Sequence, residues 1–487
     1  MHRCLSINKL KTRILSSKIF VVMSKKMSKK SLIIEMNEQE IIQSIQSRTL
    51  SVCVIGVGRI GLPTALSFAN SGLSTIGVDI NVELVEKINS KVFPLKDEPG
   101  YDVIFENVLN ENKFRATTNF SSGVNSSDVI ILSLPTPMDE NNVPDYSALL
   151  SVAQKLHDEM SDGKLIIIES TVEPGFVEND FLRILEGDDK KLKVGTNFIL
   201  GVCPETANPG QILNDFERLP RLVGAIDDYT RNLIMKIYEH VFTVTLIPMP
   251  NCKTANAVKL TTNVFRDLNI AFVNELALIF EKAGIDIMTV LEAAKTKYNF
   301  QVHYPSAGVG GPCLPVNAYQ MINFAKNFTS RTFELVENGR KINESMPSHT
   351  IELLEDALNE INKPLSESSI LVLGASYKPD VKDIQISPVE KIIDILRNKG
   401  ANILLYDPYF KNSKIFGLSV LENFISHLEK VDGLIIATAH KEFHNIDPVF
   451  LKTKMKNAVV IDSKNTLDQF SAINAGLVYR GIGRGKL

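Results

Sequence analysis

The sequence lacks three features that mark special classes of protein: long apolar runs, paired cysteines and a strong net charge. No apolar stretch reaches about 18 residues, the length that a membrane-spanning helix needs. The net charge of -3 gives no reason to expect nucleic acid or a polybasic membrane contact. Five cysteines are far apart and form no CxxC pair, which argues against a disulfide framework and a zinc site: Cys4, Cys53, Cys203, Cys252 and Cys313. We therefore expect free thiols in a reducing cytoplasm, and no metal.

The length and the N-terminus indicate several domains behind a basic tail. A chain of 487 residues is too long for one core, so two or three domains are expected. Hydrophobic residues make up 44% and charged residues 22%, which is ordinary for a soluble protein. Residues 1–30 carry nine Lys or Arg and no acid, and their apolar run, Ile19–Met23, is too short for a signal sequence. We interpret this segment as a basic tail, or as sequence ahead of a later start codon.

Strand-like and helix-like segments alternate twice along the chain. Strand-like runs occur at 51–58, 74–79, 129–134, 165–168 and 197–202, and again at 369–373, 403–406, 433–437 and 458–462. Residues 256–283 between the two series are typical of one long helix. The pattern predicts an α/β protein with two Rossmann-like doubly wound domains joined by a long central helix. We place a basic tail and short leading helix at 1–49, the first α/β domain at 50–248, a helical middle domain at 249–350, and the second α/β domain at 351–487.

A glycine-rich turn in the first domain predicts a dinucleotide site. It matches G-x-G-x-x-G, follows a strand and opens a helix: Gly56, Val57, Gly58, Arg59, Ile60 and Gly61. Asp79 stands at the end of the next strand, where a carboxylate accepts hydrogen bonds from the adenosine ribose and repels a 2′-phosphate. We therefore expect NAD rather than NADP. The alternative is a glycine-rich turn that binds nothing.

A second glycine-rich turn precedes a lone cysteine. Gly308-Val309-Gly310-Gly311-Pro312-Cys313-Leu314-Pro315 leads into an apolar run, 316–328, that is typical of a helix. The glycines let the backbone approach a ligand closely, and Pro315 suits a first helical turn. The positive field of a helix N-terminus favours a thiolate at Cys313. The alternatives are a nucleophile that forms a covalent thio-intermediate and a buried cysteine beside a tight turn.

Further polar residues lie at strand ends and on the long helix. Thr171 and Glu205 follow apolar strands, at the sheet edge where ligands collect in an open α/β fold. Lys259, Asn263 and Arg266 share one face of the long helix. A lysine on such an apolar stretch either extends to solvent or is held for function.

Together these segments resemble the UDP-glucose/GDP-mannose dehydrogenase family over residues 50–487. The motifs occur in the family's order, and they include Leu134–Pro137, Tyr377–Asp380 and Tyr406–Pro408. The Asn263 segment and the GVGGPCLPV loop are closer to the branch that oxidises UDP-N-acetylhexosamines. The resemblance implies oxidation of carbon 6 to a carboxylate with two NAD per sugar, in a homodimer or higher homo-oligomer whose long helices pair.

The resemblance also implies roles for individual residues. Cys313 would add to the aldehyde, Lys259 with Asn263 would stabilise oxyanions, and Glu205 with Thr171 would direct water. The resemblance further implies that the cofactor contacts Pro135, Thr136 and Thr171. It implies that the UDP-sugar contacts Glu205, Lys259, Asn263, Arg266, Gly310, Lys378 and Lys464.

Asn317 departs from the family pattern. The family has an aspartate four residues after the cysteine, whereas asparagine can orient a water but cannot take its proton. We count Asn317 among the catalytic candidates and expect Asn317→Asp to keep or raise the rate, unless Asn317 belongs to a reorganised site. Lys464 likewise stands where arginine is usual. Two alternatives stay open: another sugar, UDP-glucose or GDP-mannose, and a nucleotide-sugar-binding homologue with reduced turnover.

Overall fold

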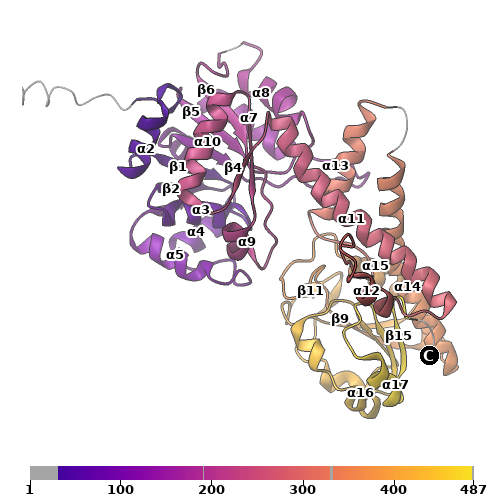
Figure 1. Cartoon of the computed structure of the whole chain (residues 1–487). Helices are drawn as coiled ribbons and strands as arrows, with labels where there is room; N and C mark the ends of the chain where they lie inside the picture. The colour runs from indigo at the N-terminus through magenta and orange to yellow at the C-terminus, as the bar shows by residue number, and fades with distance from the viewer. Residues whose placement is uncertain (1–30, 190, 330–332, 485–487) are drawn as a thin grey trace, which may run out of the picture.

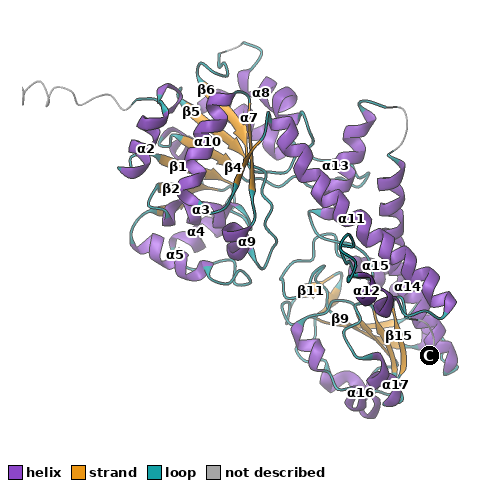
Figure 2. Ribbon diagram, viewed as in Figure 1, coloured by secondary structure: helices purple, strands orange, loops and turns teal. Residues whose placement is uncertain are grey.

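The computed structural model describes residues 31–189, 191–329 and 333–484. Figure 1 shows an N-terminal α/β part, a helical middle part and a C-terminal α/β part along the chain. The secondary structure in Figure 2 shows one sheet in each outer part, covered by helices. The α/β class and the two doubly wound domains are confirmed. The basic tail expected at 1–30 lies outside the described residues.

The first sheet has eight strands in the order β3-β2-β1-β4-β5-β6-β7-β8. The strands are β1 (Ser51–Ile55), β2 (Ser74–Val78), β3 (Phe114–Thr117), β4 (Val129–Leu132), β5 (Lys164–Ile168), β6 (Phe198–Val202), β7 (Arg221–Ala225) and β8 (Leu246–Pro248). β1 to β6 run parallel, and β7 pairs antiparallel to β6. The chain order reverses between β1 and β4, which is where ligands bind in open parallel sheets.

Helices cover both faces of this sheet. They are η1 (Ile33–Glu35), α2 (Glu38–Gln46), α3 (Gly61–Asn70), α4 (Val82–Asn89), α5 (Tyr101–Asn110), α6 (Phe120–Asn125), α7 (Ser147–Glu159), η2 (Val177–Phe181), α8 (Leu182–Glu186), α9 (Ile212–Arg218) and α10 (Asp228–Val241). Alternate strand residues enter different cores: Val52 and Val54 pack in one, Cys53 and Ile55 in the other. Burial on both faces explains why these strands are apolar without interruption.

Long helices form the middle part: α11 (Cys252–Ala283), α12 (Ile287–Ala294), α13 (Leu314–Lys326) and α14 (Glu334–Glu360). α11 begins after Asn251, whose side chain accepts a hydrogen bond from the Thr254 N–H at 2.8 Å, and ends at Gly284 with φ +69°. The long helix predicted over 256–283 is therefore confirmed and starts one turn earlier. In Figure 1 it runs from the first sheet to the C-terminal part. In the described part of the chain, no helix is long and apolar enough to cross a membrane.

The C-terminal part repeats the parallel architecture on a smaller scale. Its strands take the order β10-β9-β13-β14-β15 and all pair in parallel. They are β9 (Ser369–Leu373), β10 (Asn402–Tyr406), β13 (Gly433–Ile436), β14 (Val459–Asp462) and β15 (Val478–Gly481), with a separate pair β11 (Lys414–Ile415) and β12 (Leu418–Ser419). The helices are η3 (Leu365–Glu367), α15 (Pro388–Asn398), η4 (Ile425–Lys430), η5 (Lys441–Asn445), α16 (Pro448–Lys454) and α17 (Gln469–Asn474).

A buried ion pair joins the two longest helices. Asp267 on α11 is fully buried, and its Oδ1 accepts hydrogen bonds from Arg340 Nη1 and Asn343 Nδ2 of α14, each at 2.9 Å. Asn274, about two turns further along the same face of α11, donates to Asn343 Oδ1 at 2.9 Å and accepts from the Ser306 N–H at 2.9 Å. This polar network fixes α14 and the segment before the cysteine loop against α11.

We predict that Asp267→Asn destabilises the protein, because it removes the buried carboxylate partner of the Arg340 guanidinium and leaves only the half-exposed Glu344. The free energy of unfolding should fall by about 3 kcal/mol in urea denaturation. Glu83→Gln is the matched control, since Glu83 pairs with Lys87 at an exposed site and its removal should leave the midpoint unchanged. Equal midpoints for Asp267→Asn and the parent chain would show that the pair does not hold the helices together.

Candidate active site

The glycine turn after β1 has the shape of a dinucleotide site. Gly56 has φ +85°, and a Cβ there would lie 2.4 Å from the Ser133 carbonyl oxygen. A Cβ on Gly61 would lie 1.8 Å from the carbonyl oxygen of Gly56, so turn and helix pack too closely for a side chain. A Cβ on Gly58 would meet nothing within 4 Å. Gly58 therefore faces the open side of the turn, where the fingerprint puts the pyrophosphate.

Asp79 is fixed beside this turn. Its Oδ2 accepts from the Val57 N–H and its Oδ1 from the Asn81 N–H, both at 2.9 Å. Each oxygen retains a lone pair for a ribose hydroxyl. The residues present therefore fit NAD.

The loops after β4 and β5 close the same sheet edge. Thr136 Oγ1 donates to the Thr171 carbonyl at 3.0 Å. Ser170 Oγ accepts from the Leu134 N–H and donates to the Leu134 carbonyl, both at 2.8 Å. Pro135 stands between these contacts. Thr171 thus takes part through its carbonyl, and its side chain does not line the cavity described next.

A cavity between the three parts of the chain contains Cys313. Among the residues that line it are Asn208, Pro209, Lys259, Asn263, Arg266, Tyr304, Gly308, Gly310, Gly311, Cys313, Tyr377, Lys378 and Lys464. Cys313 is the residue immediately before α13 and is exposed on the cavity wall. A Cβ on Gly310 would lie 2.4 Å from the Ile386 carbonyl oxygen, so the cysteine loop packs tightly against the C-terminal part. The tertiary structure brings together all the predicted substrate residues except the carboxylate of Glu205.

Burial opposes the charges of Lys259, Cys313 and Lys464 in this cavity. It lowers the pKa of the Lys259 ammonium, while Cys313 and Glu205 act in the opposite direction. Surrounding protein atoms desolvate the Cys313 sulfur and raise the pKa of the thiol, although the residue keeps a surface exposed to the cavity, and Lys259 is the largest opposing influence. Among the charged groups near Cys313, Lys259 therefore favours the thiolate most, and the contribution expected from the helix N-terminus stays a prediction. Burial also lowers the pKa of Lys464 to about 8.

Four cations face the cavity without a carboxylate partner. Within residues 31–189, 191–329 and 333–484, no ion pair involves Lys259, Arg266, Lys378 or Lys464. The Lys378 ammonium donates to the Pro209 carbonyl at 3.0 Å. Uncompensated cations in a concave site attract an anionic ligand. No group of metal-binding side chains was found in those same ranges.

The carboxylate of Glu205 is held by other protein groups and does not line the cavity. Its Oε2 accepts from Arg221 Nη1 at 2.6 Å, and its Oε1 accepts from the Thr206 and Ala207 N–H groups at 2.6 and 2.8 Å. Arg221 is buried and lies against the ring of Phe242 at 3.8 Å. Sequence reasoning missed Arg221, whose signal is a single arginine at the start of the apolar strand β7.

Asn317 is buried and bridges two helices. Its Oδ1 accepts a short hydrogen bond from Asn263 Nδ2 of α11, and its Nδ2 donates to Gln320 Oε1 at 2.8 Å. Gln320 was not predicted from the sequence, although it lies three residues after Asn317 on the same helical face.

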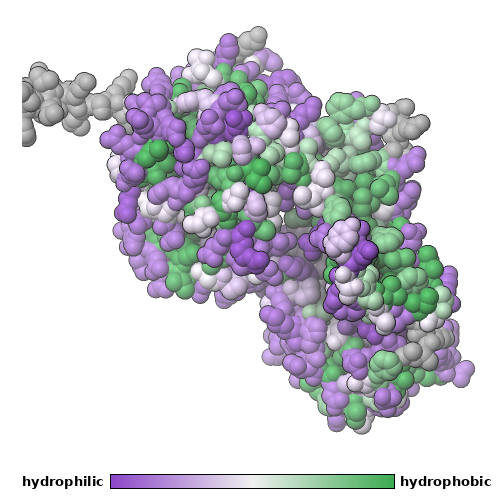
Figure 3. All heavy atoms as spheres, in the orientation of Figure 1, coloured by the Kyte–Doolittle hydropathy of each residue, from purple (hydrophilic) through white to green (hydrophobic). Residues whose placement is uncertain are grey.

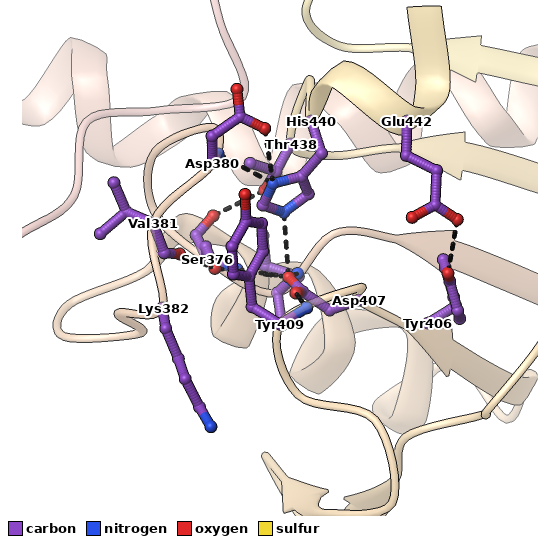
Figure 4. Close-up of polar contacts among 12 residues, drawn as sticks. Ser376, Asp380, Val381, Lys382, Tyr406, Asp407, Tyr409, Thr438, His440 and Glu442 are labelled. Carbon is purple, nitrogen blue, oxygen red and sulfur yellow. Dashed lines mark hydrogen bonds and ion pairs between the residues drawn. The ribbon is translucent and has the colours of Figure 1, made fainter. Parts of the chain in front are cut away.

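The loop that carries Lys378 is held by a buried histidine (Figure 4). The Asp380 N–H donates to His440 Nδ1 at 2.9 Å, so the neutral ring carries its proton on Nε2, which faces Asp407 Oδ2 at 3.1 Å. Burial alone would raise the pKa of Asp407, but hydrogen bonds from His440 and from the Ala375 N–H hold it below its usual value. Ser376 Oγ closes the loop by donating to the Val381 carbonyl at 2.7 Å.

Arg59 connects the glycine turn to the C-terminal part. Its Nη1 lies 2.8 Å from Asp97 Oδ2 and 3.1 Å from Glu98 Oε1, and its Nη2 donates to the Lys382 carbonyl at 3.3 Å. The Lys382 N–H donates to the same Asp97 at 3.1 Å. Arg59 thus occupies a predicted cofactor position but makes contacts between domains.

Family models and known relatives agree with this architecture. The model of the UDP-glucose/GDP-mannose dehydrogenase NAD binding domain matches residues 50–242, that of the central domain 253–345, and that of the UDP binding domain 371–469. UDP-N-acetyl-D-mannosamine dehydrogenase of Pyrococcus horikoshii is 35% identical over 436 residues, 90% of this chain and 100% of the relative. The protein of that name from Methanocaldococcus jannaschii is 31% identical over 89% of this chain and 97% of its own length.

Solved structures show the same fold. The structure of the Pyrococcus horikoshii enzyme has a TM-score of 0.83 at 34% identity and covers 90% of this chain and 100% of its own. An NDP-N-acetyl-D-galactosaminuronic acid dehydrogenase from Methanosarcina mazei has a TM-score of 0.77 at 29% identity and covers 91% and 98%. The chain therefore belongs to the UDP-glucose/GDP-mannose dehydrogenase family of NAD-dependent nucleotide-sugar dehydrogenases.

Proposed function

We propose that this chain oxidises a UDP-N-acetylhexosamine, UDP-N-acetyl-D-mannosamine or UDP-N-acetylglucosamine, at carbon 6 to the uronic acid. The observation that carries the proposal is a solvent-accessible cysteine in a cavity with four cations that form no ion pair with any described residue, between an NAD-type turn and a second α/β domain. The relatives named for UDP-N-acetyl-D-mannosamine support the first of these sugars.

The cations of the cavity suit the pyrophosphate of a UDP-sugar. Lys378 and Lys464 come from the C-terminal part, and Arg266 comes from α11. We propose that these three side chains hold the phosphates, because they line the cavity from two different parts of the chain. Gly310 lets the cysteine loop approach the sugar without a side chain in between.

Cys313 would form the covalent intermediate. The turn 56–61, Asp79 and the loops of Pro135 and Thr136 would hold NAD, which would supply the hydride acceptor, one NAD for each oxidation step. After the alcohol has become an aldehyde, the Cys313 thiolate attacks carbon 6 and gives a thiohemiacetal, which is oxidised to a thioester. Water then cleaves the thioester and frees the thiol. The overall change converts the alcohol, two NAD and one water into the carboxylate, two NADH and three protons.

Lys259 and Asn263 would stabilise the charge that develops on the carbon 6 oxygen. Both line the cavity with Cys313, and the buried Lys259 ammonium and the Asn263 amide N–H groups are donors there. Thr171 and Asn317 do not line the cavity, so we propose that they support Asn263 from the sheet edge and from α13 and do not contact the hydrolytic water. We propose that Glu205, held by Arg221, stabilises the charged form of Lys259. It also fixes the loop that follows β6 and forms part of the cavity wall.

We further propose that two copies of the chain pair through α11. Its exposed large apolar residues, Phe265, Phe272 and Ile279, recur every seven positions and are 50%, 50% and 56% exposed. Figure 3 shows apolar surface over the helical middle part. A stripe of this spacing buries well against a second helix.

A reducing cytoplasm is the compartment we propose. The cysteines at 53, 203, 252 and 313 are all unpaired. Free thiols persist where glutathione keeps them reduced.

The proposed reaction predicts two NADH per sugar from UDP-N-acetyl-D-mannosamine in an assay with a panel of nucleotide sugars. Cys313→Ser should abolish steady NADH formation while the affinity for UDP stays unchanged, because serine lacks a stable anion at neutral pH. Cys252→Ser is the control, since that thiol is buried outside the cavity. NADH only from UDP-glucose or GDP-mannose would identify a different sugar. No NADH from any sugar, with UDP still bound, would favour a binding protein.

Asp79→Asn should raise the KM for NAD about tenfold, because a charge-assisted hydrogen bond is lost. The KM for NADP should fall relative to the parent chain, since the repulsion of its 2′-phosphate is removed. Initial rates with each cofactor at saturating sugar measure both effects. Asp102→Asn on α5, an exposed acid of the same domain, is the control. An unchanged preference would remove Asp79 from the cofactor site.

The affinity for UDP should fall as the pH rises from 7 to 9. The lowered pKa of Lys464, about 8, means that the ammonium is charged below this pH and is lost as the pH passes through it. Calorimetric titration with UDP across this range measures the effect. Lys464→Met should weaken binding at pH 7 and flatten the profile, whereas Lys391→Met, at an exposed position of α15, should change neither. An equally steep profile in Lys464→Met would assign the titration to another group.

A further inference from the structure

We propose that Gln320 is a positioning residue, which works with Asn317 to fix the side chain of Asn263 beside Cys313. The inference rests on the proposed function, and it deepens it by explaining why an amide stands where the family has a carboxylate.

Three side-chain amides form a continuous line between the NAD-binding part and α11. Gln320 Nε2 donates to the Thr171 carbonyl at 3.1 Å, and Gln320 Oε1 accepts from Asn317 Nδ2 at 2.8 Å. Asn317 Oδ1 in turn accepts from Asn263 Nδ2. Gln320 and Asn317 are 0% and 3% exposed, so water does not replace these partners. The Gln320 side chain also contacts the Tyr146 hydroxyl. We call Gln320, Asn317 and Asn263 the amide line.

The Thr171 carbonyl determines the direction of every bond in the amide line. A carbonyl oxygen can only accept, so Gln320 must turn its nitrogen toward Thr171 and its oxygen toward Asn317. Asn317 must then donate to Gln320, which leaves its oxygen for Asn263. Asn263 therefore must donate with Nδ2. The carbonyl also accepts from Thr136, so both of its lone pairs are in use.

The same constraint sets what Asn263 presents to the cavity. One Nδ2 hydrogen is used by Asn317, and the second stays available in the cavity that Asn263 shares with Cys313 and Lys259. A fixed N–H donor next to the reacting carbon stabilises an oxyanion without reorganisation. The amide line thus ties this donor to the sheet edge where the cofactor loops end.

A carboxylate at position 317 would break the direction of the line. It has no hydrogen to donate to Gln320 Oε1, so two acceptor oxygens would face each other in a buried site. If the Gln320 amide rotated by 180° so that its nitrogen faced the carboxylate, its oxygen would face the oxygen of the Thr171 carbonyl, and two acceptors would again lie opposite each other. Asparagine at 317 and glutamine at 320 are therefore a matched pair, and the earlier expectation that Asn317→Asp keeps or raises the rate is replaced by an expected loss.

A double-mutant cycle between positions 317 and 320 tests the proposal. Asn317→Asp alone should lower kcat at least about tenfold while the Kd for UDP stays unchanged. The Gln320→Leu variant has no oxygen at position 320 to oppose the carboxylate. In this variant, the further change Asn317→Asp should lower kcat by less than about threefold. Asn323→Asp is the matched control, because this residue lies on the same helix and contacts Asn142 and Tyr319 outside the amide line.

Thermal unfolding of the same four proteins gives a second readout that needs no turnover. Asn317→Asp should lower the unfolding midpoint by at least about 3 °C in the parent chain, and by clearly less in Gln320→Leu. Equal losses of kcat and of midpoint in both backgrounds would overturn the proposal, as would a retained rate in Asn317→Asp alone. If Asn317→Asp lowers the unfolding midpoint less in Gln320→Leu than in the parent chain, but the parent chain oxidises no sugar, the amide line is supported and the proposed function is rejected.

Discussion

Burial of charge is the constraint on which the active site depends. The same desolvation lowers the pKa of Lys259 and Lys464 and raises that of Cys313, so each group tends toward its neutral form. The ammonium of Lys259 and the thiolate of Cys313 each favour the charged form of the other. The Glu205 carboxylate, which does not line the cavity, also favours the Lys259 ammonium. An anionic ligand would complete the compensation. In the mechanism that we propose, the same cations would bind the phosphates of the substrate and favour the thiolate of Cys313.

The long helix α11 makes this compensation possible. It begins against the first sheet, carries Lys259, Asn263 and Arg266 on one face, and reaches the C-terminal part. The buried pair of Asp267 and Arg340 joins α11 to α14, while the amide line joins it to α13 and to the end of β5. Residues from three parts of the chain can thus line one cavity, because α11 contacts all three parts and fixes their relative positions.

Much of this arrangement could be predicted from local sequence. The glycine turn, the strands and the long helix follow from short-range rules: special backbone angles, close packing and the periodicity of apolar residues. The side chain directions of Glu205 and Asn317 do not follow from such rules. Glu205 turns toward Arg221, which lies on the antiparallel strand β7, and Asn317 turns toward a helix 54 residues away in sequence. Local sequence contains no information about these distant partners.

The sequence by itself determined the two doubly wound domains, the NAD-type turn and the presence of a cysteine behind three glycines. Each of these depends on contacts within a few residues or on the regular alternation of strands and helices. Only the tertiary structure decided that Glu205 is paired with Arg221, that Lys259 lies close enough to Cys313 to favour its thiolate, and that Asn317 belongs to a directed line of amides. These features depend on burial and on partners from distant segments, and both exist only when the chain has packed.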